Sequence, residues 1–306
     1  MPLLYVGLDA GGTKTEVLAR AGAAEHRATG PGVNLQRDGA EAAAERLATL
    51  TLEALEALPH DGLGGVGAGV AGAGRSDEQA DLAERLRQRL GAHGSTETPV
   101  RVGHDAAVAL DGALDGGSGM VVVVGTGSMV LARTEGGDVH RAGGWGARIG
   151  DPGSGTALGA AALAAVADAF DGGKPTTLRD RLAQAHGIAE PDDLIRAVYQ
   201  EGLSAPALAP LVVAAAEGHD WVATRVLQRE ANALAERAGL LATRLQDADL
   251  AHRVALVGGL ATEAHYREVL AGALLRHLPD WRIVRPAASP VEGALRLAQQ
   301  APQTQP

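Results

Sequence analysis

The stretch GLDAGGTKTE, residues 7–16, decides how the rest of this sequence is interpreted. It follows an apolar run over residues 3–6 and precedes another over residues 17–19. This pattern predicts a strand, a tight turn and an antiparallel return strand, because glycine allows backbone conformations that a side chain forbids. Exposed turn amides can face an anion, the hydroxyls of Thr13 and Thr15 suit phosphate oxygens, and Asp9 suits a hydrated divalent cation. An ordinary β-hairpin is the alternative, and only the rest of the chain can decide between the two.

The composition limits the class of protein and its partners. The chain has 306 residues and 46% hydrophobic content, which suits a large core and two domains. A formal net charge of −10 without a basic run argues against nucleic acid or an anionic membrane as a partner. The absence of cysteine excludes disulfides, thiolate metal sites, iron–sulfur clusters and a cysteine nucleophile. With no leader-like start and no apolar segment suited to a bilayer, we expect a cytoplasmic protein.

The first part of the chain reads as strands followed by helices. Hydrophobic periodicity and turn residues predict strands over 25–29, 64–74 and 100–103, and helices over 40–58, 77–90 and 106–114. Residues 30–34 form a loop, and Ser76 is a candidate helix cap. Glycine alternates with Val and Ala in residues 64–74, which predicts a buried strand pressed against a close neighbour.

The second part restarts the same pattern after a glycine-rich segment, residues 115–119. A β-branched strand over 120–124, a turn at 125–128 and a return strand over 129–133 repeat the opening design and suggest a duplicated fold. We therefore expect an N-terminal domain over residues 1–115 and a C-terminal domain over 116–306. Further elements are predicted as helices over 154–170, 178–186, 192–201, 205–217, 220–246, 263–278 and 290–299, strands over 253–257 and 282–284, and a frayed tail over 300–306.

Two later glycine turns extend the phosphate hypothesis. The turn Gly125-Thr126-Gly127-Ser128 offers amides and hydroxyls, and paired with the first turn across a cleft it would grip the β- and γ-phosphates of a nucleotide. Taken alone, it is an ordinary hairpin turn. Gly258-Gly259 after a buried strand allows close approach of a flat ligand, although a strand-to-helix turn also requires small residues.

Asp105 is the candidate for chemistry because it lies where a strand ends and a helix begins, a place where α/β folds gather their sites. In phosphoryl transfer to an alcohol, one carboxylate accepts the hydroxyl proton, and Asp105 would be that base. A helix N-cap is the alternative reading of the same residue. The neighbouring His104 has no partner at metal-ligand spacing, so a metal role for it is disfavoured.

The order of these motifs resembles that of the BadF/BadG-type ATPases, and within them the N-acetylglucosamine kinases. The resemblance spans nearly the whole chain, and its most distinctive part joins Gly-Gly-Trp-Gly at 143–146 to Gly-Asp-Pro-Gly-Ser at 150–154. Its motifs, in order, are residues 7–15, 30–34, 104–107, 125–128, 143–146, 150–154 and 258–259.

This resemblance implies an α/β fold of the actin/hexokinase type, with two ribonuclease-H-like domains around a cleft that closes on ATP and sugar. The last helix, about 290–300, is a candidate to pack back on the N-terminal domain. Magnesium would lie near Asp9 through water, and relatives suggest a homodimer and transfer to the 6-hydroxyl of N-acetylglucosamine. The implied nucleotide-binding residues are Gly11, Gly12, Thr13, Gly125, Thr126, Gly127, Ser128, Gly258 and Gly259. The implied sugar-binding residues are Asn34, Asp105, Gly144, Trp145 and Asp151, with Asp105 as the base.

Several of these residues also have purely structural interpretations. Trp145 is either a sugar contact or a core anchor for its loop, and Asp151 either a sugar contact or a cap for the helix near Ser154. Asn34 is a sugar contact or a turn stabiliser. Lys14, one of two lysines, is as well explained by solvation as by phosphate binding and is left out of the site.

One departure from the family pattern leaves the substrate open. Related proteins often carry Gly-Asp-Glu-Gly-Ser where this chain has Pro152, so glucosamine, N-acetylmuramic acid or another hexose remains an alternative substrate. The chain also lacks the zinc motif and the Glu-x-Gly-His signature of the ROK sugar kinases, which disfavours that branch. Zero cysteines exclude the dehydratase activators of the family, because these hold an iron–sulfur cluster. A non-catalytic sugar sensor on the kinase fold is the alternative from another class, and retention of Asp105 favours catalysis.

Overall fold

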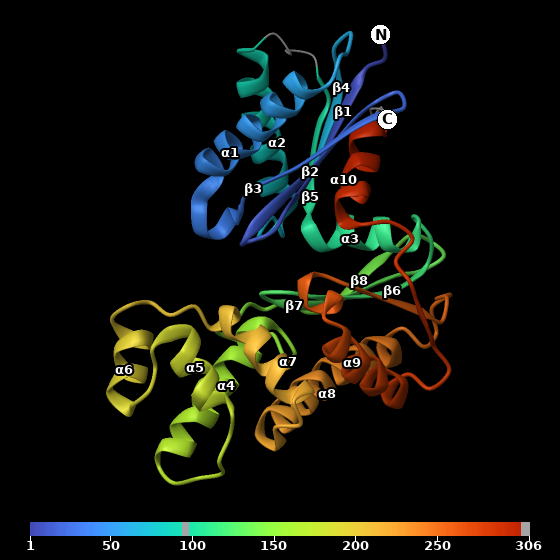
Figure 1. Ribbon diagram of the computed structural model, residues 1–306. Helices are drawn as coiled ribbons and strands as arrows, with labels where there is room; N and C mark the ends of the chain where they lie inside the picture. Colours follow the sequence, from blue (N-terminus) through green and yellow to red (C-terminus); the bar gives the residue numbers. More distant parts are fainter. Residues whose placement is uncertain (94–97, 301–306) are drawn as a thin grey trace. The chain divides into compact units, whose positions relative to one another are not determined.

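The computed structural model of the protein describes residues 1–93 and 98–300 and shows two α/β units, each built on a five-stranded sheet (Figure 1). Unit 1 comprises Met1–Gly117 and Arg285–Pro306, and unit 2 comprises Ser118–Val284. The sequence pattern predicts a division after residue 115, two residues earlier than in the structure. Of the tail predicted to fray, residues 301–306 lie outside the described part of the chain.

The sheet of unit 1 begins with the predicted hairpin. Strands β1 (Leu4–Ala10) and β2 (Lys14–Ala21) pair antiparallel, with Asp9 opposite Glu16. The sheet order is β3-β2-β1-β4-β5, in which β3 (Ala24–Pro31) is antiparallel to β2, while β4 (Leu63–Val70) and β5 (Val100–His104) run parallel to β1. The end of β4 and the end of β5 therefore lie at the same edge as the end of β1.

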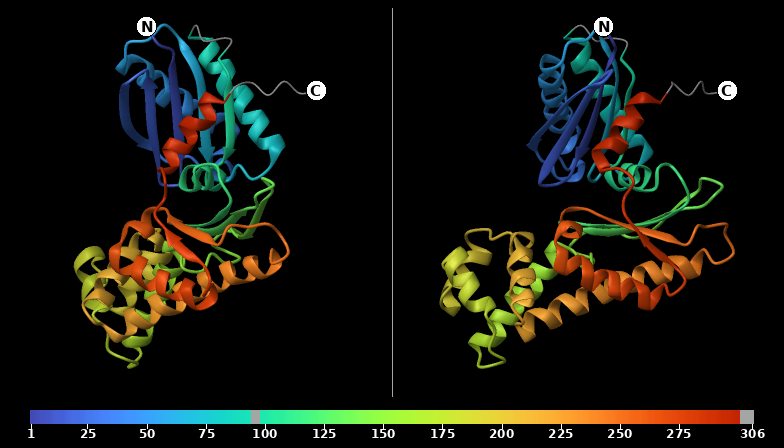
Figure 2. Two further views of the ribbon diagram at one scale, coloured as in Figure 1. Left: turned by 90° about the vertical axis from the view of Figure 1, so that its right-hand side faces the viewer. Right: turned by 45° about the vertical axis from the view of Figure 1, so that its right-hand side comes forward.

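Helices cover both faces of this sheet (Figure 2). Helices α1 (Leu35–Ala57) and α2 (Ser76–Gly91) lie on one face, and α3 (Asp105–Leu114) and α10 (Pro290–Gln299) on the other. Helix α1 starts earlier than the periodicity predicted because Asn34 caps it, and it is kinked at Gly39, whose φ is 77°. The predicted cap at Ser76 is wrong: the N-cap position of α2 is Arg75, without a side-chain hydrogen bond.

The close neighbour predicted for the glycine-rich strand is α10. A Cβ atom on Gly67 would lie 2.2 Å from the carbonyl oxygen of Ala294, and one on Gly65 would lie 2.4 Å from that of Ala298. Val66, between these glycines, and Ala68, directly after them, point to the opposite face and are fully buried in the core with α1 and α2. The alternation of Gly with Val and Ala thus lets one strand pack against helices on both of its faces.

The sheet of unit 2 repeats the sheet of unit 1. Its order is β10-β9-β6-β7-β8. Strands β6 (Gly119–Val124), β7 (Ser128–Arg133) and β8 (Val139–Gly143) follow one another along the chain, and each pairs antiparallel with the next. Strands β9 (Arg253–Val257) and β10 (Arg282–Val284) run parallel to β6. Because both sheets have the same order and the same directions, the predicted α/β fold with two ribonuclease-H-like units is confirmed.

The helices of unit 2 bury one face of β6 and β7. Met120, Val122 and Val124 alternate along β6 into this core. The helical elements are α4 (Gly155–Phe170), α5 (Leu178–His186), α6 (Pro191–Tyr199), η1 (Ala205–Leu208), α7 (Ala209–Glu217), α8 (Trp221–Arg244), η2 (Gly259–Thr262) and α9 (Ala264–His277). Across residues 1–93 and 98–300, no helix combines the length and apolarity that a membrane span requires.

Candidate active site

The turn between β1 and β2 is held by backbone bonds from both sides. The Gly11 amide donates to the Lys14 carbonyl at 3.0 Å, and the Gly11 carbonyl accepts from the Val33 amide at 2.9 Å. Neither Gly11 nor Gly12 has a positive φ, and a Cβ atom on Gly12 would meet open space. The prediction that this turn needs glycine for its backbone conformation is therefore wrong. The absence of side chains leaves room beside the amides instead, as the close approach of an anion requires.

The two threonines of this turn have different environments. Thr13 is exposed at the tip of the hairpin. Thr15 is fully buried, and its hydroxyl donates to the Pro31 carbonyl at 2.7 Å. The suggestion that the Thr15 hydroxyl suits a phosphate oxygen is therefore wrong, because that hydroxyl joins β2 to the end of β3.

Two carboxylates lie together at the edge of the sheet where β1 and β5 end. Asp9 is next to last in β1, and Asp105 is the first residue of α3, directly after β5. Burial raises the pKa of Asp9 to about 7, and the nearby charges of Asp105 and Glu16 add to the rise. A half-buried carboxylate beside a like charge, as Asp9 is, keeps its proton to a higher pH than a solvated one. The pair therefore prefers either a proton or a cation.

Asp105 is not the N-cap of its helix, so the alternative interpretation of this residue is wrong. The N-cap is His104, whose Nδ1 accepts from the Ala106 amide at 3.1 Å. One oxygen of Asp105 also accepts from that amide, at 2.8 Å, and the carboxylate is 28% exposed. Asp105 is thus oriented by the first turn of α3 and still reaches solvent.

Asn34 stabilises the start of α1 with its side-chain oxygen. This oxygen accepts from the amides of Gln36, at 3.1 Å, and Arg37, at 3.2 Å. Its backbone forms a parallel bridge with Ala71, just past the end of β4. The turn-stabilising interpretation therefore holds for the oxygen of Asn34, and its amide nitrogen is the part suited to a ligand.

In unit 2, the second glycine turn is bonded to the start of α4. The Gly125 amide donates to the Gly127 carbonyl at 2.9 Å, which closes the turn. The Gly125 carbonyl accepts from the Gly155 amide at 2.7 Å, and the Thr126 carbonyl accepts from the Thr156 hydroxyl at 2.8 Å. This packing gives the turn a fixed shape against the N-terminal end of a helix.

Ser128 and Thr126 differ in the way the two threonines of the first turn do. Thr126 is exposed, whereas Ser128 is buried and its hydroxyl donates to the Pro152 carbonyl at 2.7 Å. In this structure the Ser128 side chain joins the turn to the Gly-Asp-Pro-Gly-Ser loop.

Asp151 lies in that loop and is buried, with only 8% of the residue exposed. Its carboxylate accepts from the Gly146 amide at 3.1 Å. Burial raises the pKa of Asp151, and hydrogen bonds from the backbone at Gly146, Ser128 and Trp145 oppose that rise. The capping alternative for Asp151 is not what the structure has, because the N-cap of α4 is Ser154, whose hydroxyl accepts from the Ala157 amide at 3.1 Å.

Trp145 is not a core anchor. The residue is 61% exposed, and the Arg141 guanidinium lies 5.1 Å from the centroid of its ring. The preceding Gly144 has a φ of 69°, and a Cβ atom there would collide with the Met129 side chain at 2.2 Å. Gly144 therefore shapes the loop that presents Trp145 to solvent.

The glycines after β9 divide between the two interpretations left open. Gly258 has a φ of 104°, and a Cβ atom on it would lie 2.3 Å from the Val124 carbonyl oxygen, so the fold requires glycine there. A Cβ atom on Gly259 would meet nothing within 4 Å. Only Gly259 is left as a position where a ligand, and not the fold, would explain glycine.

Two side chains that sequence reasoning missed hold the Asp151 loop at Gly153. The Glu230 carboxylate accepts from the Gly153 amide at 3.3 Å, and the Tyr266 hydroxyl donates to the Gly153 carbonyl at 2.6 Å. Glu230 also lines a pocket of about 330 Å³ together with Asp151, Pro152 and Ser154. Both residues come from helices far along the chain, where periodicity signals only packing.

The carboxylates of unit 1 fit the magnesium that the fold family implies. Within residues 1–93 and 98–300, no group of three or more His, Cys, Asp or Glu side chains could hold a metal ion. Magnesium is bound through one or two carboxylates with waters and substrate phosphates, rather than by an all-protein cage. Asp9, beside the charge of Asp105, is a carboxylate of the kind that such a site would use.

Comparison with known proteins identifies the family of this chain. The sequence model of the BadF/BadG/BcrA/BcrD ATPase family matches residues 6–298. The chain belongs to this family. Its curated relatives include an N-acetylmuramic acid/N-acetylglucosamine kinase of Clostridium acetobutylicum, 29% identical over 75% of this chain and 76% of that protein. They also include an N-acetyl-D-glucosamine kinase of Dictyostelium discoideum, 27% identical over 96% of this chain and 97% of that protein.

Solved structures with the same fold include a candidate N-acetylglucosamine kinase and a glucokinase. A candidate N-acetylglucosamine kinase from Chromobacterium violaceum superposes with a TM-score of 0.76 at 26% identity, covering 97% of this chain and 99% of that one. A ROK family glucokinase from Streptomyces griseus, solved with glucose and AMPPNP, has a TM-score of 0.61 at 18% identity, over 97% of this chain and 100% of that one. At that identity the glucokinase shows the shared fold alone.

Proposed function

We propose that the protein is an ATP-dependent amino-sugar kinase. The observation that carries the proposal is the Asp9–Asp105 pair beside an open glycine turn, in a chain whose relatives are named N-acetylglucosamine kinases. Phosphoryl transfer needs few reactive groups: phosphates held in position, charge stabilisation and one base for the acceptor hydroxyl.

The proposed substrate is N-acetylglucosamine, phosphorylated at its 6-hydroxyl. Asp105 accepts the proton of that hydroxyl while the sugar oxygen bonds to the γ-phosphorus of ATP and ADP leaves. Exposure of part of its carboxylate and its fixed orientation at the start of α3 support this role. The amide nitrogen of Asn34, the backbone at Gly144, the Trp145 ring and Asp151 are the proposed sugar contacts.

The two glycine turns are the proposed phosphate sites. In the first, Gly12 and Thr13 offer amides and an exposed hydroxyl, while Gly11 shapes the turn through its bond to Lys14. In the second, Thr126 and Gly127 offer the same groups, while Gly125 and Ser128 fix the turn through their bonds to Gly127 and Pro152. Gly258 shapes the adenosine site, and Gly259 leaves space for it. Magnesium, held near Asp9 through water, would neutralise phosphate charge. A homodimer and a cytoplasmic location belong to the same proposal.

The test is a screen of N-acetylglucosamine, glucosamine, N-acetylmuramic acid and glucose with ATP and Mg²⁺, followed by ADP release. Nuclear magnetic resonance of the product identifies the phosphorylated hydroxyl. We expect fastest turnover with N-acetylglucosamine and a 6-phosphate product. Tight sugar binding without turnover of any of the four would overturn the kinase proposal in favour of a sugar sensor.

A further inference from the structure

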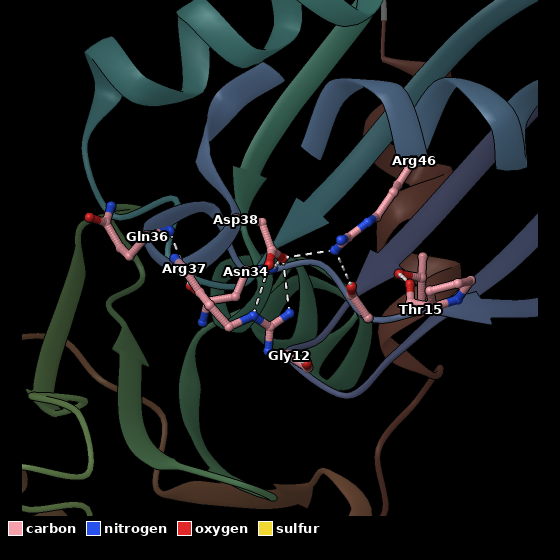
Figure 3. Close-up of polar contacts among 9 residues, drawn as sticks. Gly12, Thr15, Asn34, Gln36, Arg37, Asp38 and Arg46 are labelled. Carbon is pink, nitrogen blue, oxygen red and sulfur yellow. Dashed lines mark hydrogen bonds and ion pairs between the residues drawn. The ribbon is translucent and has the colours of Figure 1, made fainter. Parts of the chain in front are cut away.

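Arg37, on the first turn of α1, reaches back to the tip of the first glycine turn (Figure 3). Its Nη1 donates to the Gly12 carbonyl at 2.9 Å. Both residues belong to unit 1, and Gly12 is also the position where a side chain would meet open space. A cation therefore lies at the edge of the turn proposed to receive phosphate.

Asp38 fixes the plane of this guanidinium. Its two carboxylate oxygens accept from Nε and Nη2 of Arg37, each at 2.9 Å (Figure 3). Such a two-point fork allows one orientation only, which a single contact would not enforce. Asp38 is well placed for this task, because its side chain is only 10% exposed.

Asp38 is itself held from other directions. Its carboxylate accepts from the backbone N–H of Asn34 at 2.9 Å and pairs with Arg46 at 3.1 Å. Arg46 also donates to the Gly32 carbonyl at 3.2 Å. Hydrogen bonding from Arg37, with further contributions from Asn34 and Arg46, lowers the pKa of Asp38 to about 2. The anchor thus stays ionised throughout the physiological range, and it keeps partners if Arg37 is replaced.

The charges around the turn indicate why a cation is needed beside it. Asp9 and Asp105 make this edge of the sheet acidic, which opposes a polyphosphate. Lys14, the cation within the turn's own sequence, is paired with Glu16 at 2.6 Å. Arg37 has five N–H donors, of which the fork and the Gly12 bond use three, and its side chain is 55% exposed. Two donors on Nη1 and Nη2 are then left for phosphate oxygens.

We infer that Arg37, oriented by Asp38, binds the phosphates of the nucleotide at the Gly11–Thr13 turn. The inference rests on the proposed function, and it adds to the phosphate site a residue from outside the glycine motifs. A purely structural arginine would brace the turn through the Gly12 carbonyl without contacting the nucleotide.

The test compares binding of ATP, ADP and adenosine to the full chain and to Arg37→Gln, with Mg²⁺ present. We expect Arg37→Gln to weaken ATP and ADP about tenfold or more, because charged hydrogen bonds to phosphate are lost. Adenosine affinity should not change, because adenosine carries no phosphate. Arg37→Lys keeps the charge but not the fork and should fall between the two proteins.

Arg85→Gln is the matched control. Arg85 in α2 is also an exposed arginine held by carboxylates: its Nε donates to both oxygens of Asp81, at 3.0 and 2.9 Å, and its Nη1 donates to Glu41 at 2.8 Å, so none of these bonds involves the turn. This variant should bind all three compounds like the unmodified chain. The inference is overturned if Arg37→Gln binds ATP normally, or if ATP and adenosine weaken equally, which is the signature of a distorted turn.

Failure of the proposed function has a separate signature. If the unmodified chain phosphorylates no sugar, the kinase proposal fails whatever Arg37 does. If it phosphorylates sugar while Arg37→Gln keeps the same ATP affinity and KM for ATP, only the role of Arg37 is wrong.

Discussion

The carboxylate of Asp151 packs directly against the backbone of Gly127, so closely that a Cβ atom on Gly127 would lie 2.8 Å from its Oδ2. Gly127 belongs to the second glycine turn, and Asp151 to the Gly-Asp-Pro-Gly-Ser loop. Gly127, a proposed phosphate contact, has no side chain, and this leaves the space in which the carboxylate of Asp151, a proposed sugar contact, lies. Two motifs that are distant in sequence act as one structural feature within unit 2.

Gly127→Ala tests this feature. The φ of Gly127 is not in the left-handed region, so alanine should fit the backbone and force only the Asp151 carboxylate to move. We expect the KM for sugar to rise about tenfold in steady-state kinetics, because a displaced contact misaligns the substrate. Gly136→Ala is the control, since its added Cβ would have nothing closer than the Thr134 hydroxyl at 3.8 Å. Equal KM values for Gly127→Ala and the unmodified chain would show that the position of Asp151 does not matter.

Asn34 has two separable roles, and two substitutions distinguish them. Asn34→Ala removes the helix cap and should lower the free energy of unfolding by about 1 kcal/mol, and it should also raise the KM for sugar. Asn34→Ser keeps a capping oxygen but loses the amide nitrogen. We expect Asn34→Ser to unfold like the unmodified chain in urea and still show the raised KM for sugar. A normal KM in Asn34→Ser would reduce Asn34 to a cap.

Much of the fold follows from local pattern. Strand β9 (Arg253–Val257), strand β10 (Arg282–Val284) and helix α10 (Pro290–Gln299) begin and end where the apolar runs and the Pro at the helix start predicted. Strand β8 (Val139–Gly143) was not predicted. Its sequence, Val-His-Arg-Ala-Gly, has no apolar alternation, and it is a strand because β7 supplies hydrogen-bonding partners.

The candidate site could be proposed from the sequence as a set of positions but not as a set of contacts. The order of motifs located both turns and both carboxylates. It could not reveal that the hydroxyls of Thr15 and Ser128 are bonded to carbonyls 16 and 24 residues away. It also could not reveal that Arg37 reaches Gly12 across 25 residues. Such contacts depend on how separate elements pack, and no local signal in the sequence encodes them.

Asp105→Asn should abolish turnover while sparing binding. The asparagine oxygen can still accept from the Ala106 amide, so the start of α3 should keep its shape. Loss of a general base costs about 10²- to 10⁴-fold in rate, which single-turnover kinetics with ATP and N-acetylglucosamine would measure. Calorimetry should give unchanged affinities for both ligands. Asp115→Asn, at an exposed carboxylate that pairs with Arg296, is the control and should leave the rate unchanged. Unchanged turnover in Asp105→Asn would exclude it as the base.

The raised pKa of Asp9 makes the stability of the metal-free protein depend on pH. A carboxyl whose pKa is about 7 in the folded state and about 4 in the unfolded state keeps its proton to a higher pH when the protein is folded. Its contribution to stability is therefore complete below about pH 4 and is lost as pH rises to about 7. Above that pH the folded protein carries an ionised, half-buried Asp9 beside the charges of Asp105 and Glu16.

Asp9→Asn removes this charge, so it should stabilise the protein at pH 8 and lose that advantage toward pH 4. We expect a gain in the free energy of unfolding on the order of 1–4 kcal/mol at pH 8, measured by urea titration in EDTA. Glu53→Gln, at an exposed carboxylate of α1, should show no such trend. If Asp9→Asn changes stability equally at pH 4 and pH 8, burial and the charges of Asp105 and Glu16 do not raise the pKa of Asp9, and the proposed preference of this site for a proton or a cation is wrong.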